Sequence, residues 1–244
     1  MLISDKYRFI LMLPQKCATT TLQIRLRGIS DVSEYGGTPQ YNEELGKLLT
    51  KHVTAKDASK LQAYQSRSDY YKACFVRNPY DRIYSWFNWI IKNNEKQLIE
   101  IEQDAPTAPL SANEQFVYKN KLKYILHMQK RLEEVNYDFN RFVQKKPEQF
   151  KAISKYTHLN QVCQMDRIGH VETFEKDFET LCKQIHFEPR SKANANVLGK
   201  DMNSSNHETR QPQYINKYTR KTLRIINKTF AADFKNFNYS TISS

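Results

Sequence analysis

The sequence predicts an α/β fold in which a mostly parallel sheet is flanked by helices. Three short apolar runs occur along the chain, and a helical pattern follows each of them. Repeated strand-to-helix units place successive strands parallel and pack the helices on the faces of the sheet. With 244 residues, the chain matches the size of one substantial domain, so we expect a single domain over residues 1–244.

The first predicted strand is the apolar run from Tyr7 to Leu13, which ends at Pro14. In the segment that follows, Leu22 and Leu26 share one face of a predicted helix. This unit therefore combines a buried strand, a tight turn and a helix that packs back on the sheet.

The two later strands are predicted at Ala73 to Val76 and at Arg167 to Val171, and the second of them is less apolar. Each precedes a helix with an apolar stripe at intervals of three and four residues. The stripe after the first strand contains Ile83, Phe87 and Ile90, and the stripe after the second contains Phe174, Phe178, Leu181 and Ile185.

The remaining segments predict two loops and two helices. Asn93 to Leu110 contains Asp-Ala-Pro-Thr-Ala-Pro and is interpreted as a long surface loop. Helical patterns run from Gln115 to Val135 and from Pro212 to Phe234. The polar, aperiodic stretch from Pro189 to Gln211 is predicted to be a mobile loop.

The composition limits the possible partners and locations. With 38 Lys and Arg against 26 Asp and Glu, the formal charge is +12, which favours an anionic partner such as nucleic acid, a phosphorylated cofactor or an acidic polymer. A hydrophobic content of 39% excludes a disordered chain. The apolar run from Phe9 to Leu13 is far shorter than the ~20 residues of a membrane span. We therefore expect a cytoplasmic protein without an integral membrane segment.

The four cysteines are scattered along the chain and form no C-x-x-C pair. Without a histidine at metal-ligand spacing, they predict neither a structural zinc site nor a disulfide framework. We expect reduced thiols at Cys17, Cys74, Cys163 and Cys182.

An anion-binding turn is predicted between the first strand and its helix. Backbone N–H groups at a helix N-terminus attract anions, and Lys16 with the hydroxyls of Thr19 to Thr21 would add donors for a phosphate-like group. The turn is not a Walker A loop, because no glycine precedes Lys16. The alternative is a lysine in an ordinary surface loop, with a threonine that caps the helix.

A second phosphate site is predicted after the second strand. Arg77 stands at the strand end, where open α/β sheets bind ligands, and Ser85 follows it by eight residues. Pro79 suits the first position of a helix, since its missing N–H is not needed there. An arginine fork and a hydroxyl suit a phosphate, whereas the alternative is a solvated charge and a neutral helix residue.

Together the two segments, P-x-K-x-[GA]-x-T-[ST]-L and R-N-P-x-x-R-x-x-S, resemble the PAPS-dependent sulfotransferases, and most of all the branch that modifies chondroitin, dermatan and heparan hydroxyls. PAPS is 3′-phosphoadenosine 5′-phosphosulfate, the sulfuryl donor of that family. The resemblance implies a three-layer P-loop-like sandwich, no metal, and a hydroxyl acceptor that is a saccharide. It implies PAPS and its product PAP as partners, and no nucleic acid.

The resemblance also implies the residues of the donor site. The first loop would hold the 5′-phosphosulfate, and Arg77 and Ser85 would hold the 3′-phosphate. The residues of the first loop are Gln15, Lys16, Cys17, Ala18, Thr19, Thr20 and Thr21.

Sulfuryl transfer is an in-line displacement, in which an acceptor oxygen attacks sulfur while a phosphate oxygen leaves. Lys16 would neutralise the charge that builds on the leaving oxygen. His52 is similar to the histidine that serves as general base in related carbohydrate enzymes, and its alternative is a structural histidine. Glu172 and His158 are the reserve candidates for the base.

The resemblance continues to the end of the chain. The segment from Asp166 to Phe178 is similar to the family's D-x-I-G-[RK]-F-E stretch, and the segment from Tyr214 to Tyr239 is similar to its closing helix. Ala18 replaces the usual glycine and His170 the usual Arg or Lys. A Golgi anchor is missing, which points to a bacterial-type or otherwise soluble relative.

Two other classes of protein remain as alternatives. A P-loop kinase-like enzyme would share the sheet and the phosphate loop, but a Gly-rich loop and an acidic Mg²⁺ site are not evident in the sequence. A basic nucleic-acid-binding module would use the charge of +12, but it would leave both phosphate-site segments unexplained.

Overall fold

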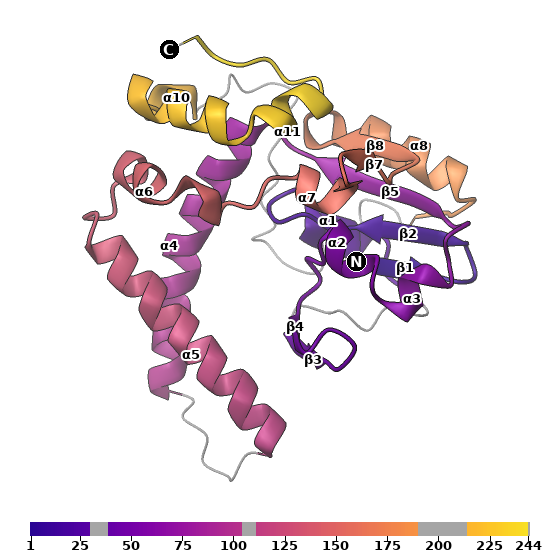
Figure 1. The fold of residues 1–244 in the computed structure, drawn as a ribbon, viewed down its shortest axis with the longest axis horizontal. Coiled ribbons are helices and arrows are strands. Elements are labelled where there is room, and N and C mark those ends of the chain that lie inside the picture. Colours follow the sequence, from indigo (N-terminus) through magenta and orange to yellow (C-terminus); the bar gives the residue numbers. More distant parts are fainter. Residues whose placement is uncertain (30–38, 104–110, 190–213, 244) are drawn as a thin grey trace. The chain divides into compact units, whose positions relative to one another are not determined.

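The structure, a computed structural model, describes residues 1–29, 39–103, 111–189 and 214–243 (Figure 1). The chain forms two compact units. The first unit consists of residues 1–78, 152–211 and 235–239, and the second of residues 79–151, 212–234 and 240–244. A single functional domain over residues 1–244 stays a prediction.

A four-stranded sheet forms the centre of the first unit, in the order β1-β2-β5-β8. The last three strands are parallel, as predicted, and β1 pairs antiparallel with β2 at one edge. The sequence does not predict β1, because three residues are too few for a periodic signal. The strands are β1 (Leu2–Ser4), β2 (Phe9–Met12), β5 (Tyr71–Val76) and β8 (Arg167–His170).

Helices cover both faces of this sheet, because its side chains alternate between two apolar clusters. Phe9 and Leu11 of β2 pack in the cluster that contains residues of α1 (Thr19–Arg25) and α8 (Phe174–Gln184). The other cluster contains Ile10 and Met12 of β2, and also residues of α2 (Ala55–Ala58), Ile153 beside α7 (Ser154–Thr157) and Phe237. The predicted mixed α/β fold with a mostly parallel sheet is confirmed.

Gly169 of β8 shows how closely the strands and their side chains pack. It is the register partner of Phe75 on β5. A Cβ atom at this position would lie 2.8 Å from Cε1 of the Phe75 ring, so only glycine fits without a shift of the ring. The ring itself lies against Phe174, with 5.2 Å between the ring centroids.

Short elements complete the first unit. The β3–β4 hairpin turns through Gly46 and leads into the loop that carries His52. These elements are β3 (Gln40–Asn42), β4 (Lys47–Leu49), α3 (Gln62–Gln65), β6 (His158–Leu159), β7 (Val162–Cys163) and the 3-10 turn η2 (Val171–Thr173).

The second unit contains two long helices, α4 and α5, that pack side by side (Figure 1). Asn94 of α4 is buried between them, and its Nδ2 donates a hydrogen bond of 2.6 Å to Oε1 of Gln129 on α5. The helices of this unit are α4 (Pro79–Gln103), α5 (Ala112–Glu133), α6 (Phe139–Lys145), η1 (Pro147–Gln149), η4 (Ile215–Lys217), α10 (Arg220–Thr229) and α11 (Ala231–Asn236), whose last residues belong to the first unit.

The prediction of a surface loop from Asn93 to Leu110 is wrong for residues 93–103, which continue α4. Most residues of this segment are polar, so it looks like a loop in the sequence. Packing against α5 supplies the stability that propensity alone does not. Residues 104–110, which contain the proline cluster, lie outside the described part of the chain.

The predicted helix from Gln115 to Val135 is confirmed by α5, which begins at a capping box formed by Ser111 and Glu114. The helix predicted from Pro212 to Phe234 is confirmed in part. Its regular portion starts with α10, where the side chain of Thr219 accepts a hydrogen bond from the N–H of Thr222. The predicted loop after Pro189 lies outside the described residues.

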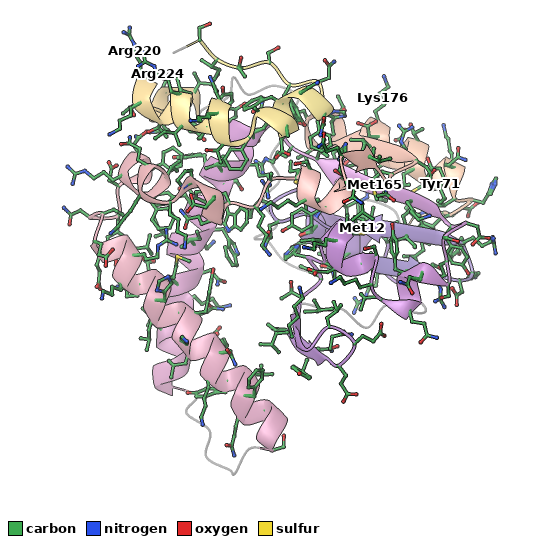
Figure 2. The ribbon with its side chains drawn as sticks, viewed as in Figure 1. Met12, Tyr71, Met165, Lys176, Arg220 and Arg224 are labelled. Atoms are coloured by element: carbon green, nitrogen blue, oxygen red, sulfur yellow. The ribbon has the colours of Figure 1, made fainter. Side chains whose placement is uncertain are left out.

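The amphipathic pattern of α10 is visible in its side chains. Leu223 and Ile226 are buried, whereas Arg220 and Arg224 are exposed and point away from the unit (Figure 2). Among the helices that the structure describes, none has the length and apolar character needed to cross a membrane.

Candidate functional site

The carboxyl ends of β2, β5 and β8 meet at one edge of the sheet, because the three strands are parallel (Figure 1). Three segments reach this edge: the loop from Leu13 to Ala18, the pair Arg77 and Asn78, and the turn that contains Glu172. Ligands of open α/β sheets bind outside this edge. It is therefore the place where the predicted residues are expected to act.

The loop after β2, residues 13–18, has an unusual backbone. Lys16 (φ 64°) and Ala18 (φ 54°) both adopt the left-handed conformation. Ala18 is also the N-cap of α1, and its carbonyl oxygen accepts a hydrogen bond of 2.9 Å from the N–H of Leu22. This conformation favours glycine, which is the residue that the resemblance described above leads us to expect where this chain has Ala18.

Cations gather around this loop. An Nη1 atom of Arg77 donates a hydrogen bond of 3.3 Å to the carbonyl oxygen of Lys16. Burial, together with the charges of Arg77 and Lys51, lowers the pKa of Lys16 to about 8. The two lysines and the arginine therefore repel one another, and an anion at this place would relieve that repulsion.

His52 lies in the loop between β4 and α2, and its ring reaches the same segment. Its Nδ1 is 2.6 Å from the carbonyl oxygen of Leu13. Since a carbonyl oxygen only accepts, Nδ1 carries the proton, and the lone pair of the neutral ring is on Nε2. The structure thus brings Lys16, Arg77 and His52 to one loop.

The other residues of the predicted donor loop differ in how far their side chains are exposed. The side chain of Cys17 is buried in the core, and its N–H donates a hydrogen bond of 3.4 Å to the carbonyl oxygen of Pro14. Thr19 is buried, Thr21 half-buried and Thr20 exposed, all in the first turn of α1.

Two side chains around the loop were not predicted. Nζ of Lys51 donates a hydrogen bond of 2.7 Å to Oε1 of Gln23 on α1, and burial lowers the pKa of Lys51. The hydroxyl of Tyr156 donates to Oε1 of Gln15. The only sequence signal for Lys51 is its position beside His52, and nothing in the sequence pairs Tyr156 with the loop.

Ser85 lies on α4, in the second unit, at a half-buried position. Its pairing with Arg77 around a second phosphate stays a prediction.

Both reserve candidates for the base have other partners. One oxygen of Glu172 accepts a hydrogen bond of 2.6 Å from the N–H of Asn78, and the other accepts one of 2.9 Å from the hydroxyl of Tyr239. Nδ1 of His158 is 2.8 Å from Oγ1 of Thr157. These contacts give Glu172 the geometry of a structural carboxylate.

Within the described ranges, no group of three or more His, Cys, Asp or Glu side chains is placed to hold a metal ion.

A family model described as the sulfotransferase family matches residues 1–240. The matched range includes the loop after β2, Arg77 and the closing Tyr239. No curated protein and no solved structure matches the chain.

The backbone at Ala18 leads to a stability prediction. Ala18→Gly should raise the free energy of unfolding by about 1 kcal/mol, because glycine adopts the left-handed conformation without the steric cost that alanine carries. The matched control is Ala232→Gly within α11, which should lower it by roughly 0.5–1 kcal/mol. Urea unfolding measures both. A variant at position 18 that loses stability would contradict the strain assigned to the loop.

Proposed function

The chain belongs to the sulfotransferase family, and from this we propose that it transfers the sulfuryl group of PAPS to a hydroxyl of an acceptor. The proposal depends on one observation, which is that the positive charges of Lys16, Arg77 and Lys51 lie close together at the loop after β2. Cations held together in this way favour a ligand with several negative charges, and PAPS carries a phosphosulfate and a separate 3′-phosphate.

In the proposed reaction the acceptor oxygen bonds to sulfur while the bond between sulfur and the bridging phosphate oxygen breaks, which leaves PAP. Lys16 meets the charge that develops on that oxygen, and its partial burial strengthens the interaction. Arg77 binds the 3′-phosphate, whose charge does not change during transfer. The loop residues 15–21 contribute N–H groups and hydroxyls to the phosphosulfate.

His52 is proposed as the general base. The hydrogen bond between its Nδ1 and Leu13 leaves Nε2 as the nitrogen that accepts a proton. The proton of the acceptor hydroxyl would move to Nε2 as the new bond to sulfur forms. Glu172 is a weaker candidate, because both of its oxygens already accept hydrogen bonds.

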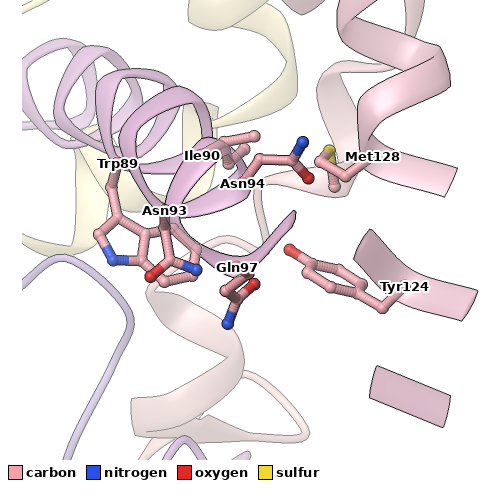
Figure 3. Close-up of a pocket in the computed structure, with 7 residues that line it drawn as sticks. All are labelled: Trp89, Ile90, Asn93, Asn94, Gln97, Tyr124 and Met128. Atoms are coloured by element: carbon pink, nitrogen blue, oxygen red, sulfur yellow. The ribbon is translucent and has the colours of Figure 1, made fainter. Parts of the chain in front are cut away.

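A saccharide is the acceptor that we propose. The second unit has a shallow hollow between α4 and α5, where Trp89, Asn93 and Gln97 follow one another along α4 and Tyr124 faces them from α5 (Figure 3). Trp89 is 41% exposed and Tyr124 is 47% exposed, although aromatic residues at helical spacing normally pack in the core. Exposed rings beside amide groups can stack on the apolar face of a sugar and hydrogen-bond its hydroxyls.

The proposed donor can be tested with ligands alone. PAP should raise the melting temperature more than ATP with Mg²⁺ does, since PAP carries the 3′-phosphate that Arg77 would bind. A ligand at about 100 times its Kd contributes roughly 2.7 kcal/mol of stability. Thermal unfolding with PAP, ATP with Mg²⁺ and a random oligonucleotide compares the three function classes. A larger shift with ATP or the oligonucleotide would sink the PAPS assignment.

The roles of Lys16 and Arg77 predict different kinetic defects. Lys16→Ala should lower kcat by ~100-fold or more, because the charge that Lys16 meets grows in the transition state. Arg77→Ala should mainly weaken PAP binding, since the 3′-phosphate is the same in both states. Arg27→Ala, which removes an equal charge at an exposed position, serves as control. The opposite pattern would reverse the two assignments.

The pH profile tests His52 and Lys16 together. The rate should fall at acidic pH as the imidazole takes up a proton, and His52→Ala should lower kcat by about 10²–10⁴ with little change in PAP affinity. With its pKa at about 8 in the free protein, Lys16 loses its charge above that pH, so kcat/KM should fall as the pH rises through about 8. Exposed His127→Ala is the control. A His52 variant with more than a third of wild-type kcat would make His52 structural.

A further inference from the structure

Glu172 connects three segments that lie far apart in the sequence. It follows β8, its Oε1 accepts from the N–H of Asn78 after β5, and its Oε2 accepts from the hydroxyl of Tyr239 near the end of the chain. A carboxylate that accepts two hydrogen bonds forms stronger bonds than a neutral acceptor does. The contact therefore ties the end of one parallel strand to the end of its neighbour and to the C-terminal segment.

This connection reaches Arg77 through the backbone. The N–H of Asn78 belongs to the peptide group that joins it to Arg77, so the bond to Glu172 fixes the plane of that group. The direction in which the Arg77 side chain leaves the strand end depends on this plane. From there the guanidinium reaches the carbonyl oxygen of Lys16 at 3.3 Å.

The C-terminal segment presents Tyr239 to Glu172 through a fixed turn. Phe237 is buried in the core, and Asn238 adopts the left-handed conformation (φ 57°), which asparagine tolerates better than most residues. The rings of Tyr239 and His170 are arranged edge to face, with 5.6 Å between their centroids. Nε2 of His170 is 3.3 Å from the carbonyl oxygen of Phe237. Both the ring and the hydroxyl of Tyr239 are thus held in place.

The electrostatic surroundings keep Tyr239 a hydrogen-bond donor. Burial, followed by the charge of Glu172, raises the pKa of Tyr239 well above its usual value, so the hydroxyl keeps its proton. The charge of Arg77 acts on the same hydroxyl in the opposite direction. Tyr239 therefore lies within electrostatic reach of the arginine that it would help to place.

We propose that Glu172 and Tyr239 are positioning residues of the donor site, which orient Arg77 through the Asn78 N–H and make donor binding depend on the segment from Phe237 to Tyr239. The inference rests on the proposed function, because it assigns Arg77 to the donor. It also gives Glu172 a role different from that of a base.

Tyr239→Phe is the direct test, because it removes the hydroxyl and keeps the ring and the net charge. PAP affinity, measured by calorimetry without acceptor, should fall roughly fivefold, the effect of one lost hydrogen bond, while kcat at saturating substrates stays within about twofold. Tyr70→Phe is the matched control. Its hydroxyl also donates a hydrogen bond of 2.9 Å, in this case to Asp5. Tyr70 directly precedes β5 and therefore lies at the opposite end of that strand from Arg77. PAP affinity should not change in this variant.

Melting temperatures of both variants separate positioning from general stability. An unchanged PAP affinity in Tyr239→Phe overturns the proposal, whatever its melting temperature. A wild-type protein that does not bind PAP overturns the proposed function, and the positioning role with it.

Glu172→Gln provides a second readout. The amide can accept from the Asn78 N–H through Oε1 and donate to the Tyr239 oxygen through Nε2, so the connection can form again. We expect PAP affinity and kcat within about threefold of the wild type. A loss of kcat of more than a hundredfold with unchanged PAP affinity would make Glu172 the base and overturn the positioning role.

Discussion

The parallel pairing of β2, β5 and β8 is the constraint on which the candidate site depends. Parallel strands end at the same edge of a sheet, so the loop after β2, Arg77 after β5 and Glu172 after β8 arrive together although they are distant in sequence. Apolar side chains on both faces hold this register, since a slip by one residue would exchange the two faces of each strand. The geometry of the site is thus a consequence of how the core packs.

The same edge concentrates features that reduce stability. Lys16 and Ala18 hold the left-handed backbone without being glycine, and Lys16 is partly buried beside Arg77 and Lys51. Strained backbone and like charges persist where the surrounding structure over-determines them, and such places are often functional. An anionic ligand would convert this repulsion into attraction, which is why the cationic loop supports sulfuryl transfer better than a purely structural role.

The end of the chain contributes to this edge as well. Phe237 fills the core beneath the sheet, and Tyr239 reaches the carboxylate of Glu172. This hydrogen bond joins two residues that are 67 positions apart in the sequence, and it connects the last segment of the first unit to the residues around Arg77. The sulfotransferase family model matches residues 1–240, so this segment is part of the matched region.

The sequence by itself determined the elements whose signals are local. The three parallel strands, the apolar stripes of α1 and α8, and the choice of Lys16 and Arg77 as candidates could all be predicted, because periodicity and strand-end position depend on neighbours in the chain. Only the tertiary structure decided the rest. The continuation of α4 to Gln103 depends on its packing against α5, and the contacts of His52 with Leu13 and of Glu172 with Tyr239 depend on segments that meet only after folding. A hydrogen bond between distant segments leaves no periodic signal in a sequence, so its partners can be identified only from their positions in space.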